Sequence, residues 1–135
     1  MVRAYQLSDL GLFPNRCEGG TNLVMMEYLA CGKPVVAAYA TGHRDVLTDE
    51  NAFLLRSLRP VVWRDAQGTV LARWQEPFLD DLVAQVEHAY HHREIAKLKG
   101  AQAAAVMRQF TWARAAEVVL RRMREQEEHP SGAGA

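Results

Sequence analysis

The spacing of hydrophobic residues over positions 10–38 predicts a strand, a helix and a second strand. Leu10–Phe13 is a short apolar run followed by proline, which predicts a buried strand that leads into a loop. From position 22 to 31 the apolar residues recur at the spacing of one helical face, and Gly32 with Pro34 ends that helix. Val35–Ala38 is again β-branched and apolar. A strand, a helix and a strand in this order are typical of a parallel α/β sheet.

The remainder of the chain predicts three short strands followed only by helices. The strands are expected at Ala52–Leu55, Arg59–Trp63 and Thr69–Trp74, with a turn at Asp65–Gly68 between the last two. Beyond Pro77 the apolar residues take helical spacing, and the helices are expected at Leu79–Tyr90, Glu94–Gln109 and Trp112–Glu127. We therefore predict one α/β domain over residues 1–128 and a flexible tail over 129–135, where small residues offer nothing to pack.

The composition narrows the classes of function. The 135 residues are 49% hydrophobic and 24% charged, and 16 basic residues balance 16 acidic ones, so no net field favours nucleic acid. Cys17 and Cys31 are too few and wrongly spaced for a disulfide framework or a zinc site, and the N-terminus lacks a signal-peptide pattern. No apolar run approaches the roughly 20 residues that span a bilayer, so no transmembrane segment is expected. We expect a cytoplasmic location, with peripheral membrane contact left open.

The loop between the first strand and the first helix has the features of an anion-binding site. In open parallel sheets, ligands bind at the carboxyl ends of the strands, where loops meet helix N-termini. Gly19 and Gly20 allow the backbone to approach a ligand closely, and Thr21 or Asn22 can cap the helix. The free N–H groups from Thr21 to Val24 and the helix dipole favour negative charge. A phosphate or diphosphate fits this loop best.

Two carboxylates, Glu18 and Glu27, bracket the same segment. Both are unexpected beside a diphosphate unless they bind hydroxyl groups. Glu27 lies one turn inside a helix whose other face is apolar, where an ionised carboxylate is costly unless it is hydrogen-bonded. The hydroxyls of a ribose and of a sugar ring would supply the donors. A solvated position for each carboxylate, and a common Gly-Gly turn, are the alternative interpretation.

The run FPNRCEGGTNLVMMEYLACGKPVVA resembles the donor-site signature of the retaining GT-B glycosyltransferases of family 4 (group 1). In that family a Phe-Pro strand end precedes a Glu-Gly loop, a helix with a second Glu, and an Ala-Cys-Gly-x-Pro-Val-Val run. The matching residues are Phe13, Pro14, Glu18, Gly19, Glu27, Ala30, Cys31, Gly32, Pro34, Val35 and Val36. The segment around Trp112 resembles the start of the family's last helix, so the likeness covers most of residues 10–124.

The resemblance implies a Rossmann-like parallel sheet of a GT-B C-terminal domain, incomplete at its N-terminal side and helical at its C-terminal end. It implies a glycosyltransferase of the hexosyltransferase type, which transfers a sugar from a nucleoside-diphosphate sugar to an unknown acceptor with retention of configuration. Glu18 would be the catalytic-site residue that positions the donor sugar, and Glu27 would hold the ribose. The diphosphate and sugar would be bound by Gly19, Gly20, Thr21, Asn22 and Leu23. No cofactor and no metal ion are expected.

Two departures from the family pattern leave alternatives open. The family usually places seven residues between its two glutamates, whereas eight separate Glu18 from Glu27. Either Glu18 or the backbone of Gly19 then occupies the position of the first glutamate. Thr41-Gly42-His43 stands where the family more often has a Gly-Gly pair. His43 therefore either approaches the donor sugar or has no role there.

The resemblance also implies an acceptor-binding domain and upstream strands that would precede Met1. We therefore expect a truncated gene product or half of a split enzyme, inactive by itself, whose missing N-terminal domain could be supplied by a separate chain. Two other functions stay open. One is a non-catalytic remnant that binds a nucleotide or a partner chain, and the other is a GT-B nucleotide-sugar epimerase.

Overall fold

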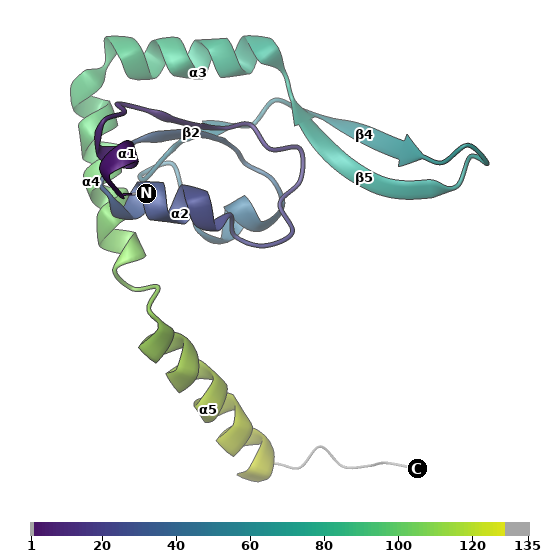
Figure 1. Cartoon of the computed structure of the whole chain (residues 1–135), viewed down its shortest axis with the longest axis vertical. Coiled ribbons are helices and arrows are strands. Elements are labelled where there is room, and N and C mark those ends of the chain that lie inside the picture. The colour runs from purple at the N-terminus through teal and green to yellow at the C-terminus, as the bar shows by residue number, and fades with distance from the viewer. Residues whose placement is uncertain (1, 129–135) are drawn as a thin grey trace.

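The computed structural model describes residues 2–128, and a parallel sheet of three strands lies at its centre (Figure 1). The strands β1 (Gly11–Phe13), β2 (Val35–Ala38) and β3 (Phe53–Leu55) are neighbours in that order, and both pairings are parallel. Phe13 lies opposite Ala37, which in turn lies opposite Leu54. The expected parallel α/β sheet is therefore confirmed.

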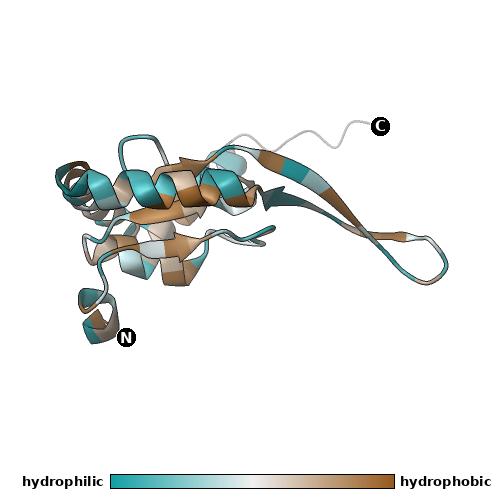
Figure 2. Ribbon diagram, turned by 90° about the horizontal axis from the view of Figure 1, so that it is seen from above, coloured by the Kyte–Doolittle hydropathy of each residue, from teal (hydrophilic) through white to brown (hydrophobic). Residues whose placement is uncertain are grey.

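Helices cover both faces of this sheet, as an all-parallel sheet requires. The helices α2 (Leu23–Ala30) and α4 (Arg93–Met107) lie on one face. The helix α3 (Leu79–His91) lies along the other face, above apolar strands (Figure 2). All three helices begin within two residues of the positions that the apolar spacing predicts.

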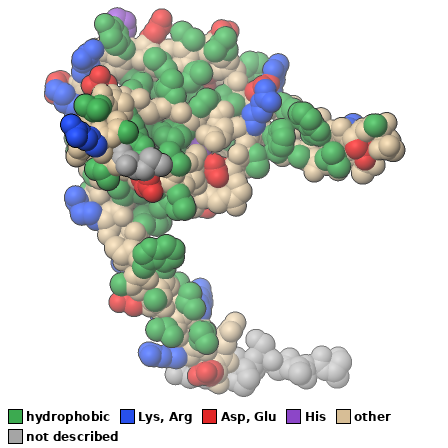
Figure 3. Space-filling view, in the orientation of Figure 1, with side chains coloured by type: hydrophobic (Ala, Val, Ile, Leu, Met, Phe, Trp, Pro, Cys, Tyr) green, Lys and Arg blue, Asp and Glu red, His purple; other side chains and the backbone are tan. Residues whose placement is uncertain are grey.

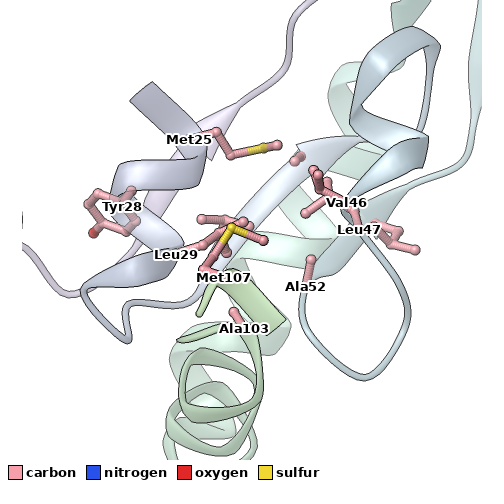
Figure 4. Packing of buried hydrophobic residues seen from close by; sticks show 11 residues of the cluster. Met25, Tyr28, Leu29, Val46, Leu47, Ala52, Ala103 and Met107 are labelled. Atoms are coloured by element: carbon pink, nitrogen blue, oxygen red, sulfur yellow. The ribbon is translucent and has the colours of Figure 1, made fainter. Parts of the chain in front are cut away.

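Successive residues of β2 point to opposite faces and fill both halves of the core. Val35 belongs to the cluster that contains α2 and α4, in which Leu29 points toward Ala103 and Met107 (Figure 4). Val36 belongs to the second cluster, together with Ala89 of α3. Both valines are fully buried, so β2 is the central strand of the fold.

A two-stranded antiparallel arm leaves the sheet at its carboxyl edge. It consists of β4 (Leu58–Arg64) and β5 (Val70–Pro77), with Val61 opposite Trp74. In the turn between them, the Asp65 carboxylate accepts hydrogen bonds from the N–H groups of Gln67 and Thr69. Figures 1 and 3 show the arm projecting from the body, with hydrophobic side chains along its length. The predicted hairpin is confirmed, and Trp63 packs on Trp74 with ring centroids 5.6 Å apart.

Two short elements were not predicted from the sequence. The helix α1 (Val2–Gln6) precedes β1, and Tyr5 packs edge-to-face on Tyr28 of α2 with ring centroids 5.6 Å apart. The 3₁₀ helix η1 (Thr41–Asp45) follows β2. Each spans five residues, too few to show a helical hydrophobic period.

The last helix, α5 (Trp112–Glu128), leads away from the body of the protein (Figure 1). Its described side chains, from Trp112 to Glu127, are all exposed. Trp112 is 92% exposed, because among the described residues α5 has no sheet beneath it. The tail predicted over 129–135 lies outside the described residues. Over residues 2–128, none of the helices combines the length and the apolar character needed to cross a bilayer.

We predict that Gly100→Ala destabilises the fold. Ala normally favours a helix by about 1 kcal/mol over Gly. At Gly100, however, an added Cβ would lie 2.3 Å from the carbonyl oxygen of Gly32, at the crossing of α4 and the α2–β2 turn. Overpacking of this kind costs about 1–3 kcal/mol, so the free energy of unfolding measured with urea should fall. Gln102→Ala, at an exposed position of the same helix, is the control, and a more stable Gly100→Ala variant would contradict the close contact.

Candidate functional site

The candidate site lies at the carboxyl edge of the sheet, where two loops meet. The first runs from Pro14 to Asn22, between β1 and α2, and will be called the Gly-Gly loop. The second is the start of η1, Thr41–His43, which follows β2. Because β1 and β2 are parallel neighbours, their carboxyl ends bring the two segments together. This edge is where ligands bind in open parallel sheets.

Asn22 is the N-cap of α2, one of the two residues that the sequence offered for this role. Its side-chain Oδ1 accepts a hydrogen bond from the N–H of Met25 at 3.1 Å. Its backbone is left-handed, with φ 60° and ψ 85°, whereas N-cap residues are usually extended. The other candidate, Thr21, donates its hydroxyl to the sulfur of Met26 instead.

Two backbone amides at the start of α2 point out of the helix without a partner. The first N–H groups of a helix have no acceptor within it. That of Met25 is bonded to Asn22, but those of Leu23 and Val24 donate to no atom within the described residues 2–128. They lie at the positive end of the helix dipole, which favours an anion. The residues that the sequence named for a diphosphate therefore surround a helix N-terminus with free donors.

Three consecutive residues of η1 contact every second residue of the Gly-Gly loop from Glu18 to Asn22. Thr41 Oγ1 accepts a hydrogen bond from the N–H of Glu18 at 3.0 Å. Gly42 packs so closely on Gly20 that an added Cβ would lie 1.6 Å from the Gly20 carbonyl oxygen. The third contact is between His43 Nε2 and Asn22 Nδ2, at 3.2 Å. The loop therefore takes its shape from the segment after β2.

The residues with a strained backbone lie at the contact between η1 and the Gly-Gly loop. Over residues 2–128, the residues other than glycine with positive φ are Asn22 and Thr41, at 60° and 47°. Such conformations are costly for residues with a Cβ and persist where surrounding contacts impose them. One of these residues lies on each side of the contact, so both segments are held in a defined shape.

The two candidate glutamates have different surroundings. Glu18 is half-buried in the Gly-Gly loop, and within residues 2–128 its carboxylate accepts no hydrogen bond. Glu27 is exposed on α2, and its Oε2 accepts a hydrogen bond from the hydroxyl of Tyr5 at 2.9 Å. This hydrogen bond raises the pKa of Tyr5 above its usual value. Glu27 is therefore oriented by α1, while the carboxylate of Glu18 is free of protein partners in this part of the chain.

The Gly-Gly loop is also fastened to the base of the β4–β5 arm. Glu76 on β5 forms ion pairs with Arg16 of the loop and with Arg59 of β4. The N–H of Gln75 donates to the carbonyl oxygen of Arg16 at 3.0 Å. The contacts of Arg16 with β5 join residues about sixty positions apart, so no local pattern in the sequence could predict them. The pKa of Glu76 is lowered, first by its hydrogen bonds from Arg59 and then by Arg16.

The rest of the structure offers little competing chemistry. Over the described residues, no group of three His, Cys, Asp or Glu side chains is placed to hold a metal ion. Cys17 and Cys31 are both free thiols. A groove of about 590 Å³ lies at the amino edge of the sheet, between Cys31–Pro34 and the helices α3 and α4. That groove is on the opposite edge from the Gly-Gly loop, since Leu10 and Pro34, which line it, precede β1 and β2.

Comparison with known proteins agrees with this fold, and the residues that match a family include the Gly-Gly loop. Residues 1–72, just over half of the chain, match the family described as glycosyl transferases group 1, and the chain belongs to that family. A D-inositol 3-phosphate glycosyltransferase from Xylanimonas cellulosilytica is 39% identical over 69 residues, which are 50% of this chain. Those residues are 16% of that enzyme, so this chain spans a small part of its curated relative.

A solved structure with the same fold is that of Anabaena Alr3699/HepE in complex with UDP. It superposes with a TM-score of 0.56 at 20% identity, over 79% of this chain and 24% of the other. The α/β architecture is therefore the Rossmann-like GT-B fold, with a helical C-terminal end. The prediction of a GT-B glycosyltransferase domain is confirmed at this level.

We predict that Glu76→Gln changes how stability depends on pH. A lowered pKa in the folded state means that ionised Glu76 stabilises the fold above about pH 4.3, the usual value for glutamate. This contribution is lost as the pH falls through the lowered folded value. Urea unfolding from about pH 7 to about pH 3 should therefore show a difference between the two proteins that shrinks in acid.

The matched control is Glu87→Gln, at an exposed position of α3 with no ion pair among residues 2–128. This variant should follow the pH dependence of the unsubstituted chain. A difference between Glu76→Gln and the unsubstituted chain that stays constant down to acid pH would show that the ion pairs of Glu76 do not stabilise the fold.

Proposed function

We propose that this chain forms the donor-binding side of a retaining, family 4 type glycosyltransferase, and that it binds a nucleoside-diphosphate sugar at the Gly-Gly loop. The observation that carries the proposal is the start of α2, where the N–H groups of Leu23 and Val24 are free and Asn22 caps the next one. An N-terminus of this kind suits the diphosphate of a sugar nucleotide. The complex of Alr3699/HepE with UDP supports the choice of ligand, since that protein shares the fold.

The diphosphate is the leaving group of the proposed reaction, and negative charge builds up on it as the bond to the sugar breaks. Amides that already point at this position stabilise that charge without rearranging. In our proposal Gly19, Gly20 and Thr21 bring further backbone close to the diphosphate. The loop is held in shape by η1 and the arm before any ligand arrives, which lowers the entropy cost of binding.

The two glutamates take separate roles in this proposal. Glu18 positions the donor sugar, because its carboxylate is free within the described residues and lies in the loop beside the helix N-terminus. Glu27 holds the ribose. Its hydrogen bond from Tyr5 orients the carboxylate and uses one of its acceptor positions, which leaves the others for a pair of hydroxyl groups. No protein nucleophile is assigned, since attack on the same face as the departing diphosphate gives retention.

The acceptor side of the reaction is assigned to no residue here. The relative from Xylanimonas cellulosilytica is named a D-inositol 3-phosphate glycosyltransferase, and this chain covers 16% of it. We propose that the acceptor contacts are made outside these 135 residues, and that the chain by itself binds the nucleotide without transferring the sugar. Sugar transfer by the purified chain with any nucleotide sugar would refute this part of the proposal.

We predict that Glu27→Ala weakens nucleoside-diphosphate binding by roughly 10- to 100-fold, the equivalent of one or two hydrogen bonds to a charged group. Glu27 is exposed and helical, so alanine should leave the fold intact. The measurement is calorimetric titration with UDP and GDP, each paired with its 2′-deoxy form. The unsubstituted chain should prefer the ribonucleotide, whereas Glu27→Ala should bind both forms alike.

Glu87→Ala, at an exposed position of α3, is the control for the removal of one carboxylate. It should bind as the unsubstituted chain does. If Glu27→Ala kept full affinity and full preference for the ribonucleotide, the ribose role of Glu27 would be refuted, while the diphosphate site could still stand.

A further inference from the structure

His43 is buried directly behind the candidate site, although it is a polar residue at the start of a short 3₁₀ helix. The residue is 1% exposed. Its ring makes two hydrogen bonds, from Nδ1 to the carbonyl oxygen of Ala38 at 2.9 Å and from Nε2 to Asn22 Nδ2 at 3.2 Å. The ring therefore connects the end of β2 to Asn22, the last residue of the Gly-Gly loop and the N-cap of α2.

The partners of the ring determine which nitrogen carries the proton. Asn22 Oδ1 already accepts the N–H of Met25, so the end of the amide that faces His43 is the Nδ2 donor. His43 Nε2 must then accept. Nδ1 carries the proton and donates it to Ala38, which can only accept. With this assignment each donor around the ring meets an acceptor.

The hydrogen bond from the His43 ring acts on Asn22, one of the two residues other than glycine with positive φ within residues 2–128. Asn22 is left-handed and caps α2, and the directions of the Leu23 and Val24 amides follow from its backbone. An asparagine side chain can turn over and offer its NH₂ group to Met25, which would break the cap. The acceptor nitrogen of His43 prevents this, because the turned amide would point its oxygen at a lone pair.

We propose that His43 is a positioning residue of the donor site: through Asn22 it fixes the capped start of α2, and thereby the two amides that receive the diphosphate. The inference rests on the proposed function and assigns His43 no contact with the ligand. It differs from both alternatives that the sequence left open, approach to the sugar and the absence of a role. Thr41 and Gly42, its neighbours, hold the same loop at Glu18 and Gly20.

Two substitutions of His43 test the two hydrogen bonds of the ring one at a time, because each can keep one bond and removes the other. His43→Gln places an amide oxygen near the position of Nε2 and can keep the acceptor for Asn22. His43→Asn has a shorter side chain, which reaches only the position of Nδ1 and keeps the bond to Ala38. Loss of a helix cap typically lowers the equilibrium constant for folding about fivefold. We expect His43→Asn to weaken UDP or GDP binding about fivefold or more, and His43→Gln to retain most of the affinity.

The matched control is Asn51→Ser. Asn51 is also 1% exposed and also bridges backbone groups, at Val46 and Thr48, but it is not in the Gly-Gly loop. Asn51→Ser should lower the unfolding temperature without changing the affinity of the folded protein for UDP or GDP. A second readout needs no ligand: hydrogen exchange of the Met25 amide should be faster in His43→Asn than in His43→Gln.

A double-substitution cycle tests whether the effect runs through Asn22. Asn22→Gly tolerates the left-handed backbone but removes the side chain, so His43→Asn should cause no further loss in that background. Full affinity in His43→Asn, or an equal loss in the Asn22→Gly background, would overturn the inference while the proposed function stands. Failure of the unsubstituted chain to bind either nucleotide would overturn the proposed function, and this inference with it.

Discussion

The carbonyl oxygen of Gly20 lies 1.6 Å from where a Cβ on Gly42 would be, and the shape of the Gly-Gly loop depends on this approach. Only glycine at position 42 lets the backbone after β2 come so close to the loop after β1. Once the two segments touch, Thr41 can bind the amide of Glu18 and His43 can reach Asn22. The parallel pairing of β1 and β2 brings the two segments to the same edge of the sheet. The close approach of Gly42 to Gly20 then sets how the two segments lie against each other.

The strain at Asn22 and Thr41 has a use in the proposed function. A capped helix with an ordinary extended N-cap would also present free amides, but the chain would enter it from another direction. Here the left-handed Asn22 turns the Gly-Gly loop back over η1, and the Arg16–Glu76 ion pair fixes its outer side to the β4–β5 arm. Core packing of α2 against α4 holds the helix itself, so the loop is supported by η1, by the arm and by α2.

Much of the fold could be predicted because its signals are local. The β-branched run at Val35–Ala38 and the helical spacing before Gly32 are read from a few neighbouring residues, and both elements are where they were expected. The approach of Gly42 to Gly20, the burial of His43 and the pairing of Arg16 with Glu76 join residues twenty to sixty positions apart, and no periodicity reports such pairs. The roles of Glu18 and Glu27 remain predictions.

The proposed diphosphate site is tested most directly by nuclear magnetic resonance of the amide groups during titration with UDP or GDP. If the start of α2 receives the diphosphate, the largest shifts should occur at Leu23 and Val24, with smaller ones through Gly19 and Gly20. Shifts confined to the groove at Cys31–Pro34 and α3, on the opposite edge of the sheet, would contradict it.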